Sequence, residues 1–451
     1  MAGKSYTMDM TEGSIISKMI VFALPLMLSS VLQLLFNAAD VIVVGRFAGE
    51  QSLAAVGSTG ALINLLISVL MGLSVGANVL IARYYGAGDA KNCQESIQSS
   101  ILFSLVGGAV MAVVGIVLSR PLLFLMGTPD DVIDKSVTYM RIYFVGMPVM
   151  ALYNFGSAVL RSKGDTRRPL YFLIIAGILN VGLNLFFVIV FHMDVAGVAL
   201  ATVISQALSA ALILIAIIRD QDICRLDLKG MRFYGDKMKE MVRIGLPAGL
   251  QGAVFSISNV LIQSSVNSFG SLVMAGNTAA ANIEGFIYVA MNSIYQTSLS
   301  FSSQNVGARK YKRLTRITLD GVGIVTVIGL ALGMLALILR YPLLSIYTDN
   351  PDVVKFGIIR MMIICPTYWL CGIMDTMVGN LRGLGYSIMP MIVSLTGACG
   401  LRVVWILTLF RMDPSQKILY ISYPVSWAVT ALAHIICYIV VKRKFDKEHQ
   451  I

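Results

Sequence analysis

Long stretches without a charged side chain dominate this sequence. Eleven runs of at least 19 residues contain no Asp, Glu, Lys or Arg. An α-helix rises about 1.5 Å per residue, so about 20 apolar residues cross the roughly 30 Å hydrocarbon core of a bilayer. Charged residues make up only 13% of the 451 positions, about half the share found in soluble domains. The chain is therefore predicted to be an all-α integral membrane protein.

The runs define twelve predicted transmembrane helices. Ile244–Ile283 is too long for one helix, and its polar segment Asn267–Gly270 is interpreted as a turn. Val353–Val378 counts as a span although three charged residues interrupt it. The uninterrupted runs are Met19–Ala39, Ser52–Ala82, Ser96–Ser119, Ile142–Leu160, Pro169–Phe191, Val195–Ile218, Ile244–Ile283, Gly285–Ala308, Gly321–Leu339, Gly383–Leu401 and Ile418–Val441.

The distribution of basic residues predicts the orientation. With twelve spans and the N-terminus inside, inward segments carry 25 of the 35 Lys and Arg residues and outward loops carry 7. Cytoplasmic loops of membrane proteins are enriched in Lys and Arg. The protein is therefore expected in a bacterial cell membrane, with both termini on the cytoplasmic side. The net charge of +11 is explained by topology, so nucleic acid is not an expected partner.

Several functional classes are disfavoured by missing motifs. The six cysteines form no CxxC pair, and the three histidines are far apart in the chain, so no resident cofactor or structural metal site is expected. No GxxxxGK[ST] loop is present, which argues against ATP hydrolysis. The N-terminus lacks the features of a removable signal peptide. No catalytic cluster stands out in the spans, and the chain is predicted not to be an enzyme.

An internal repeat organises the chain. The strongest landmark is L-R-x-x-G-x-x-x-x-P, which begins at Leu160 and recurs from Leu381. Three other landmarks recur at nearly the same separation: Leu24-Pro25 and Leu246-Pro247, Gly86-Ala87 and Gly307-Ala308, and Pro129-Asp130 and Pro351-Asp352. The sequence thus predicts two six-helix lobes, residues 1–225 and 226–451, joined through the polar segment Arg219–Lys239. Because six is even, the lobes share their orientation and are related by a pseudo-twofold axis along the membrane normal.

Duplicated lobes of this kind are typical of transporters. Polar groups within the spans then indicate where ions or substrates bind, because an ionised side chain in mid-membrane costs roughly 2.5–3.5 kcal/mol on insertion scales. A duplicated scaffolding protein is the alternative.

The first lobe contains a predicted cation-coupling site. Gln33, Asn37 and Asp40 are spaced to line one helical face. A carboxylate among amide and hydroxyl oxygens can hold a proton or a hard cation such as Na⁺, and nearby spans supply such groups. The predicted coupling residues are Asp40, Asn180, Asn184 and Thr202, and the first-lobe cavity residues are Gln33, Asn37, Asn64 and Asn154. One alternative is that Asp40 lies at the membrane surface and forms an ion pair with Arg46. The other is that the asparagines only form hydrogen bonds between helices.

The second lobe differs in its polar residues. Its acids within otherwise apolar spans are Glu284 and Asp375, which the repeat places opposite Asn64 and Asn154, while Asp40 falls near Gln263. This asymmetry predicts that one lobe couples the cation and the other attracts a cationic substrate. The second-lobe cavity residues are predicted to be Asn259, Gln263, Glu284 and Asp375. Pairing of either acid with a base such as Arg402 is the alternative.

Proline lies within the first span of each lobe. Pro25 and Pro247 each remove an intrahelical hydrogen bond and favour a bend. A bend near Asp40 would link cation binding to the shape of the cavity, so the two prolines are predicted hinges. A packing role is an equally good interpretation.

The chain resembles the multidrug and toxin extrusion (MATE) family of cation-coupled exporters over about residues 14–440. The resemblance rests on Pro25 with Asn37-Ala38-Ala39-Asp40 and Val44-Gly45, on Gln304-Asn305-Val306-Gly307-Ala308, on Gly164-Asp165-Thr166 before Pro169, and on both L-R-x-x-G segments. It implies a V-shaped bundle of twelve helices in two lobes with alternating access. It also implies antiport of H⁺ or Na⁺ against amphipathic, often cationic, organic compounds.

The resemblance also implies roles for single residues. The family's first-span acid maps onto Asp40, its fifth-span polar pair onto Asn180 and Asn184, and the tenth-span acid of some members onto Asp375. Some members have an acid where this chain has Asn184. The seventh-span acid of the Na⁺-coupled branch has no match, because Ser256–Gln263 contains no carboxylate.

The predicted function is therefore export of amphipathic organic compounds by H⁺ or Na⁺ antiport, by a protein expected to be a monomer among membrane lipids. If Na⁺ is the coupling ion, Asp40, Asn180 and Asn184 are its predicted ligands. A flippase for lipid-linked glycans and a membrane channel remain as alternatives.

Overall fold

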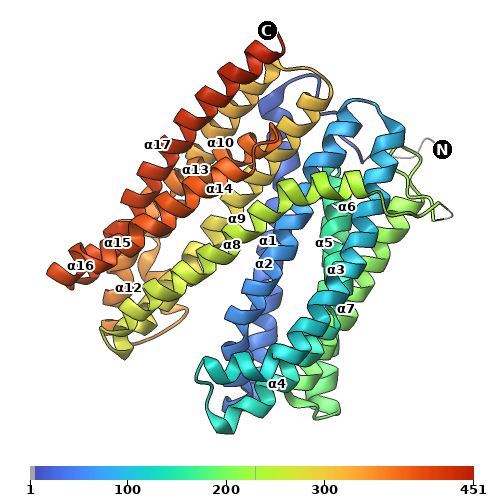
Figure 1. The fold of residues 1–451 in the computed structure, drawn as a ribbon. Coiled ribbons are helices and arrows are strands. Elements are labelled where there is room, and N and C mark those ends of the chain that lie inside the picture. Colours follow the sequence, from blue (N-terminus) through green and yellow to red (C-terminus); the bar gives the residue numbers. More distant parts are fainter. Residues whose placement is uncertain (1–5, 229, 451) are drawn as a thin grey trace. The chain divides into compact units, whose positions relative to one another are not determined.

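The structure is a computed structural model that describes residues 6–228 and 230–450, and in this part of the chain every regular element is a helix (Figure 1). Ten helical segments, three of them composed of consecutive shorter elements, are long and apolar enough to cross a membrane, and the pair α4 (Asp130–Val145) and α5 (Met147–Ser162), bent by 48°, gives an eleventh when it is counted as one span. The 37-residue α9 (Ser271–Gly307) is a further long helix, whose apolar character is reduced by residues such as Asn277 and Glu284. The described residues thus contain the twelve long helical segments predicted from the sequence.

The chain divides into two compact units. The first contains residues up to Asp9 and Leu28–Gly249, and the second contains Met10–Met27 and Leu250–Ile451. The remaining helices of the first unit are α2 (Glu50–Gly86), α3 (Ala90–Leu125), α6 (Arg167–Leu185) with its π-helical end η1 (Phe186–Val190), and α7 (Asp194–Ile218). Those of the second are α10 (Lys312–Ile338), α11 (Arg340–Ser345), α12 (Pro351–Ile364), η2 (Cys365–Thr367), α13 (Tyr368–Gly383), α14 (Ile388–Ser394), the π-helical η3 (Leu395–Gly400), α15 (Leu401–Leu407), α16 (Leu409–Met412) and α17 (Gln416–Glu448).

Two helices belong to both units. In α1 (Ile15–Phe47), the residues up to Met27 belong to the second unit and those from Leu28 belong to the first. In α8 (Gly235–Asn267), the residues up to Gly249 belong to the first unit and those from Leu250 belong to the second. The contact-based units therefore differ from the domains predicted from the repeat, residues 1–225 and 226–451, whose ends at 1–5 and 451 lie outside the described residues. The repeat-based boundary stays a prediction about the duplicated sequence.

The helix surfaces fit a bilayer environment. α3 exposes Val106, Val110, Val113 and Val117 at 54–64% of their surface, and their spacing of four, three and four residues places them on one helical face. Inside the second unit, small side chains allow backbones to approach closely. A Cβ atom at Gly379 would lie 2.8 Å from the carbonyl oxygen of Tyr295. Apolar exposed faces and small interior residues are typical of membrane helix bundles.

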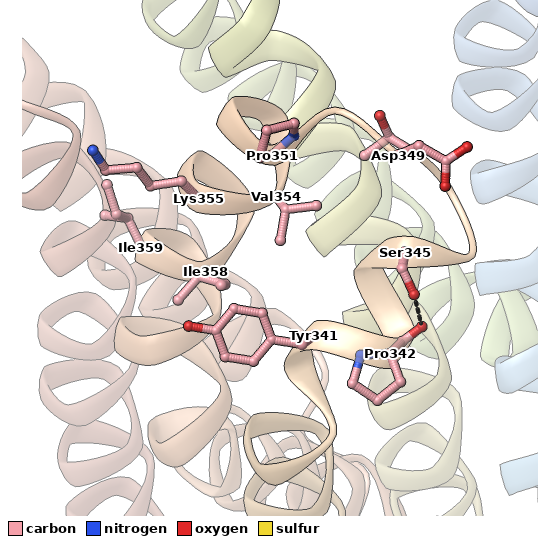
Figure 2. Close-up of a pocket in the computed structure, with 10 residues that line it drawn as sticks. Tyr341, Pro342, Ser345, Asp349, Pro351, Val354, Lys355, Ile358 and Ile359 are labelled. Atoms are coloured by element: carbon pink, nitrogen blue, oxygen red, sulfur yellow. Dashed lines mark hydrogen bonds between the residues drawn. The ribbon is translucent and has the colours of Figure 1, made fainter.

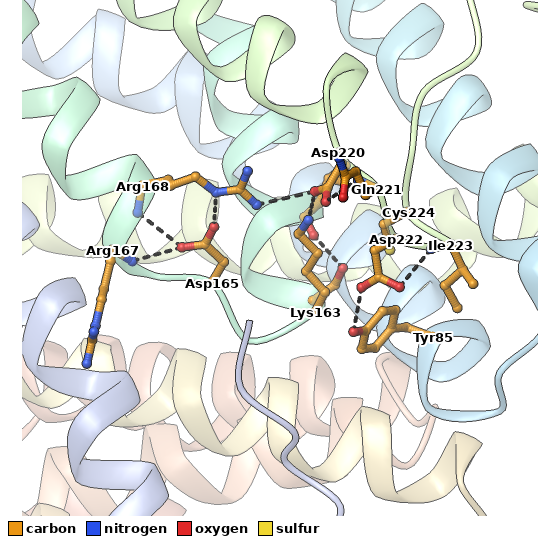
Figure 3. A network of polar contacts seen from close by, with 12 residues as sticks. Tyr85, Lys163, Asp165, Arg167, Arg168, Asp220, Gln221, Asp222, Ile223 and Cys224 are labelled. Carbon is orange, nitrogen blue, oxygen red and sulfur yellow. Dashed lines mark hydrogen bonds and ion pairs between the residues drawn. The ribbon is translucent and has the colours of Figure 1, made fainter. Parts of the chain in front are cut away.

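The segment between α7 and α8 is anchored to the first unit by polar contacts (Figure 3). Asp220 forms ion pairs with the buried Lys163 and with Arg168, and Asp222 accepts a 2.7 Å hydrogen bond from the hydroxyl group of Tyr85. Asp165 accepts hydrogen bonds from the backbone amides of Arg167 and Arg168, 3.1 Å each. The first unit therefore holds the beginning of the predicted linker.

Candidate functional site: a cation-coupling cluster in the first unit

The four predicted coupling residues lie together in the first unit. Asn184 on α6 donates a hydrogen bond from its Nδ2 atom to the carboxylate of Asp40 on α1. The same Nδ2 atom donates to Oδ1 of Asn180 at 3.2 Å, and Nδ2 of Asn180 donates to Oγ1 of Thr202 on α7 at 3.4 Å. Asn180 and Asn184 are buried, whereas Asp40 and Thr202 are partly exposed. Three helices thus contribute to one continuous polar cluster.

A close contact between α1 and α6 positions this cluster. Gly177 lies one turn before Asn180, and a Cβ atom at Gly177 would be 1.9 Å from Cε2 of Phe36. The Phe36 ring therefore occupies the space that a side chain at residue 177 would need. Because Phe36 and Asp40 are one helical turn apart on α1, this packing places the Asp40 carboxylate near Asn184.

The oxygen atoms of the cluster are suited to a proton or a hard cation. Asp40 supplies a carboxylate, Asn180 and Asn184 supply amide oxygens, and Thr202 supplies a hydroxyl group. Oδ1 of Asn184 is buried and accepts no hydrogen bond from the described residues. Buried polar atoms normally have a partner, and oxygen atoms are the ligands that hard cations prefer. No group of three or more His, Cys, Asp or Glu in the described residues forms a transition-metal site.

The other predicted first-lobe cavity residues are not members of this hydrogen-bonded cluster. Gln33, Asn37 and Asn64 are exposed, and Asn154 donates a 2.9 Å hydrogen bond to the backbone oxygen of Met150. Their predicted cavity role remains a prediction. The alternative surface pair between Asp40 and Arg46 does not form, because Arg46 makes no ion pair in the described part of the chain and Asp40 contacts Asn184 instead.

In the second unit, Glu284 belongs to a buried ion pair. Nε and Nη2 of Arg360 on α12 donate to the two Glu284 carboxylate oxygens at 2.9 and 2.7 Å. Nη1 of Arg360 donates to Oδ1 of Asn277 at 2.8 Å, and Nδ2 of Asn277 donates to Gln263 at 3.2 Å. The partner of Glu284 is therefore Arg360 and not Arg402, the base considered in the sequence analysis.

Asp375 and Asn259 lie outside this network. Asp375 on α13 is partly exposed and forms no ion pair or hydrogen bond with the described residues, and Asn259 on α8 is exposed. Unlike Glu284, Asp375 is therefore a predicted cavity acid whose charge is not balanced by a directly bound base.

Sequence reasoning missed Asn277, Gly177 and the pairing role of Arg360. An arginine in a predicted span was a signal for an ion pair, because an isolated charge within the bilayer is costly. The sequence offered no comparable signal for Gly177, because many glycines of this chain occur in helices.

Both predicted hinge prolines lie inside continuous helices. α1 runs through Pro25 and α8 runs through Pro247. In each helix the change from one unit to the other follows two residues after the proline. The hinge role itself stays a prediction.

A surface pocket of about 640 Å³ lies elsewhere in the second unit, beside α11 and α12 (Figure 2). Its lining includes Tyr341, Asp349, Lys355, Ile358 and Ile359. None of the predicted site residues lines this pocket, so it is separate from both polar networks.

Comparison with known proteins identifies the family. The MatE family pattern matches residues 25–186 and again residues 247–408. The chain belongs to the MatE family. The first match begins at Pro25 and the second at Pro247, which agrees with the duplication inferred from the sequence. As predicted, the chain is a membrane transporter and not an enzyme.

Similar proteins support this assignment along the whole chain. The probable multidrug resistance protein YoeA of Bacillus subtilis is 28% identical over 435 residues, which cover 94% of each chain. The probable multidrug resistance protein NorM of Thermotoga maritima is 26% identical over 404 residues, covering 87% of this chain and 85% of its own. A solved multidrug resistance MATE family transporter in an outward-facing conformation has the same fold, with a TM-score of 0.90, 21% identity and coverage of 97% and 98%.

Proposed function

We propose that this MatE-family transporter exports amphipathic, mostly cationic organic compounds across a bacterial cell membrane, in exchange for H⁺ or Na⁺ bound at the cluster of Asp40, Asn180, Asn184 and Thr202. The observation that carries the proposal is the contact between the carboxylate of Asp40 and the amide of Asn184. Similarity to proteins named for multidrug resistance supports the substrate class. In this proposal both termini face the cytoplasm.

A single carboxylate can couple ion entry to export. A membrane potential of about 100 mV contributes about 2.3 kcal/mol per elementary charge moved, and one pH unit contributes about 1.4 kcal/mol per proton. Either gradient is thus large enough to drive roughly tenfold accumulation or more. Binding of the ion neutralises Asp40 and changes its contact with Asn184. In the proposed mechanism, this change favours release of the substrate on the outer side of the membrane. The empty binding site then returns to face the cytoplasm.

The decisive test is ethidium transport by the purified full chain in proteoliposomes under an imposed H⁺ gradient or an imposed Na⁺ gradient. Wild type is expected to transport ethidium with one of these gradients, and Asp40→Asn is expected to lose the gradient-driven part. Asp134→Asn is a matched control, because Asp134 is a highly exposed acid in a surface pair with Arg120. Transport that Asp40→Asn retains in full would remove Asp40 from the coupling mechanism.

A further inference from the structure

The second unit contains an arginine next to the position that corresponds to Asn180. The family pattern matches residues 25–186 and then residues 247–408, and the separation of 221 between Pro169 and Pro390 places Leu401 on α15 opposite Asn180 on α6, with Arg402 as the next residue. Arg402 follows the π-helical segment η3 by two residues. A positive charge thus lies in the part of the second repeat that corresponds to the coupling cluster of the first unit.

Arg402 is buried without a carboxylate partner. Its side chain is 3% exposed, and its Nε atom donates a 2.9 Å hydrogen bond to Oγ of Ser426 on α17. Its Nη2 atom is buried and has no hydrogen-bond partner among the described residues. An unpaired buried charge is costly, and natural structures usually provide such a group with a partner.

Aromatic rings flank this guanidinium group. Its central carbon lies 4.3 Å from the ring centroid of Tyr423 and 5.6 Å from that of Trp427. These contacts stabilise the cation, but they do not supply a hydrogen-bond acceptor for Nη2. Arg360 also contacts the Tyr423 ring, at 5.3 Å. The guanidinium groups of Arg360 and Arg402 thus both contact the ring of Tyr423.

No acid of the described residues forms an ion pair with Arg402. Glu284 uses both carboxylate oxygens to bind Arg360. Asp375 forms no ion pair in the described part of the chain. Asp375 and Arg402 are therefore an acid and a buried base of the second unit that form no ion pair in the described part of the chain.

We propose that Arg402 binds an anionic group of the transported compound, such as a carboxylate, while Tyr423 and Trp427 pack against its apolar part. Together with Asp375, this arrangement would suit zwitterionic aromatic compounds. The proposal rests on the export function proposed above and specifies the substrate chemistry that the second unit recognises.

The helix around Arg402 provides a way to expose this buried group. π-Helical turns are rare and frequently occur at functional sites. Conversion of η3 to α-helical geometry would move the following residues by one position, or about 100° around the helix axis. Such a change would turn Arg402 relative to Tyr423 and Trp427.

Two matched dyes test this site. Rhodamine 110 carries a delocalised cation and a carboxylate, and rhodamine 123 is its methyl ester, which lacks the negative charge. Binding of each dye to the detergent-solubilised full chain is measured by fluorescence anisotropy. Arg402→Gln is expected to weaken binding of rhodamine 110 about tenfold, the effect of losing one charge-assisted hydrogen bond, and to leave rhodamine 123 binding within about twofold of wild type.

Two further variants keep the test decisive. Arg402→Lys keeps the charge but loses the planar donor geometry, so it is expected to weaken rhodamine 110 binding less than Arg402→Gln does. Arg411→Gln removes an equal charge from an exposed position and is expected to leave the binding of both dyes unchanged. If Arg402→Gln does not fold, selective weakening of rhodamine 110 binding by Arg402→Lys supports the proposal, and unchanged binding contradicts it.

Other outcomes contradict the proposed anion-binding site at Arg402. A wild-type chain that does not bind rhodamine 110, or an Arg402→Gln variant that keeps wild-type affinity for it, contradicts the proposal. Equal weakening of both dyes shows a structural role for Arg402. The export function is tested separately by gradient-driven transport of rhodamine 123 in proteoliposomes, so its failure is distinguishable from failure of the anion site.

Discussion

The side-chain amide of Asn184 contacts the carboxylate of Asp40 although the two residues are 144 positions apart in the chain. Asn184 lies on α6 and Asp40 lies on α1, so this contact joins two helices of the first unit. Asn184 is fully buried, and its Nδ2 atom also donates to Asn180. The amide thus connects the predicted ion-binding carboxylate to the rest of the polar cluster.

Replacement of Asn184 by Leu is therefore expected to reduce ion-driven transport by about tenfold or more, because it removes an interaction with a charged group that is worth about 1.5–3 kcal/mol. Ethidium transport under the productive gradient measures the effect. Gln51→Leu is the control, because Gln51 lies exposed on α2, is not a predicted site residue and is expected to retain transport within about twofold. Equal loss in both variants would show that the effect is not specific to the cluster.

The packing of Phe36 on Gly177 predicts an effect on stability. Gly177→Ala places a Cβ atom 1.9 Å from Cε2 of Phe36, and overpacking of this kind costs about 1–3 kcal/mol. A Cβ atom at Gly182 on the same helix meets nothing within 4 Å. Gly182→Ala is therefore expected to be neutral or slightly stabilising. The thermal unfolding midpoint in detergent compares the two variants, and equal midpoints would contradict the packing account.

Part of this site follows from sequence and part does not. The spacing of Asn180 and Asn184 predicted a shared helical face, and the repeat predicted which residues correspond. The contacts of Glu284 depend instead on how α9 and α12 pack, and several arginines in the spans were possible partners. Gly177 is a comparable case, because its importance comes from the Phe36 ring on another helix. Long-range packing selects one arrangement from several that the sequence pattern allows.

The ion pair of Glu284 and Arg360 is expected to stabilise the second unit. Glu284→Gln leaves Arg360 buried without its negative partner, and breaking a buried pair from one side typically costs about 3–5 kcal/mol. Asp134→Asn breaks the exposed pair with Arg120, and exposed pairs contribute about 0–1 kcal/mol. Urea or thermal unfolding compares the two variants. A similar small effect of both substitutions would show that Glu284 contributes little to stability.

Cysteine reactivity tests the packing of the segment that follows α7. The Sγ atoms of Cys93 and Cys224 lie 3.3 Å apart, and both side chains are buried. The contact with Cys93, together with burial, raises the pKa of the Cys224 thiol. Because the thiolate is the reactive form, Cys224 is expected to react slowly with a maleimide at pH 8, and Cys437, which is partly exposed, is expected to react faster.

Mass spectrometry of the labelled, folded chain identifies which cysteine has reacted. Complete unfolding is the control and is expected to make both thiols reactive. Rapid labelling of Cys224 in the folded chain would show that this segment leaves the first unit readily.

The prolines of α1 and α8 lead to a prediction about turnover. Each helix changes unit two residues after its proline, at Met27–Leu28 and at Gly249–Leu250. Proline lacks the backbone N–H that would bond to the carbonyl four residues earlier, so each helix lacks one restraining hydrogen bond shortly before the point where it passes from one unit to the other. Pro25→Ala restores that donor and is expected to slow transport about fivefold while leaving ethidium binding nearly unchanged, because about 1 kcal/mol per added hydrogen bond would oppose bending. Pro424→Ala is the matched control, because Pro424 lies inside α17, a helix that belongs entirely to the second unit. If both substitutions slow transport equally, the position of Pro25 between units has no special role; if Pro25→Ala alone does so, flexibility at this point limits the rate of transport.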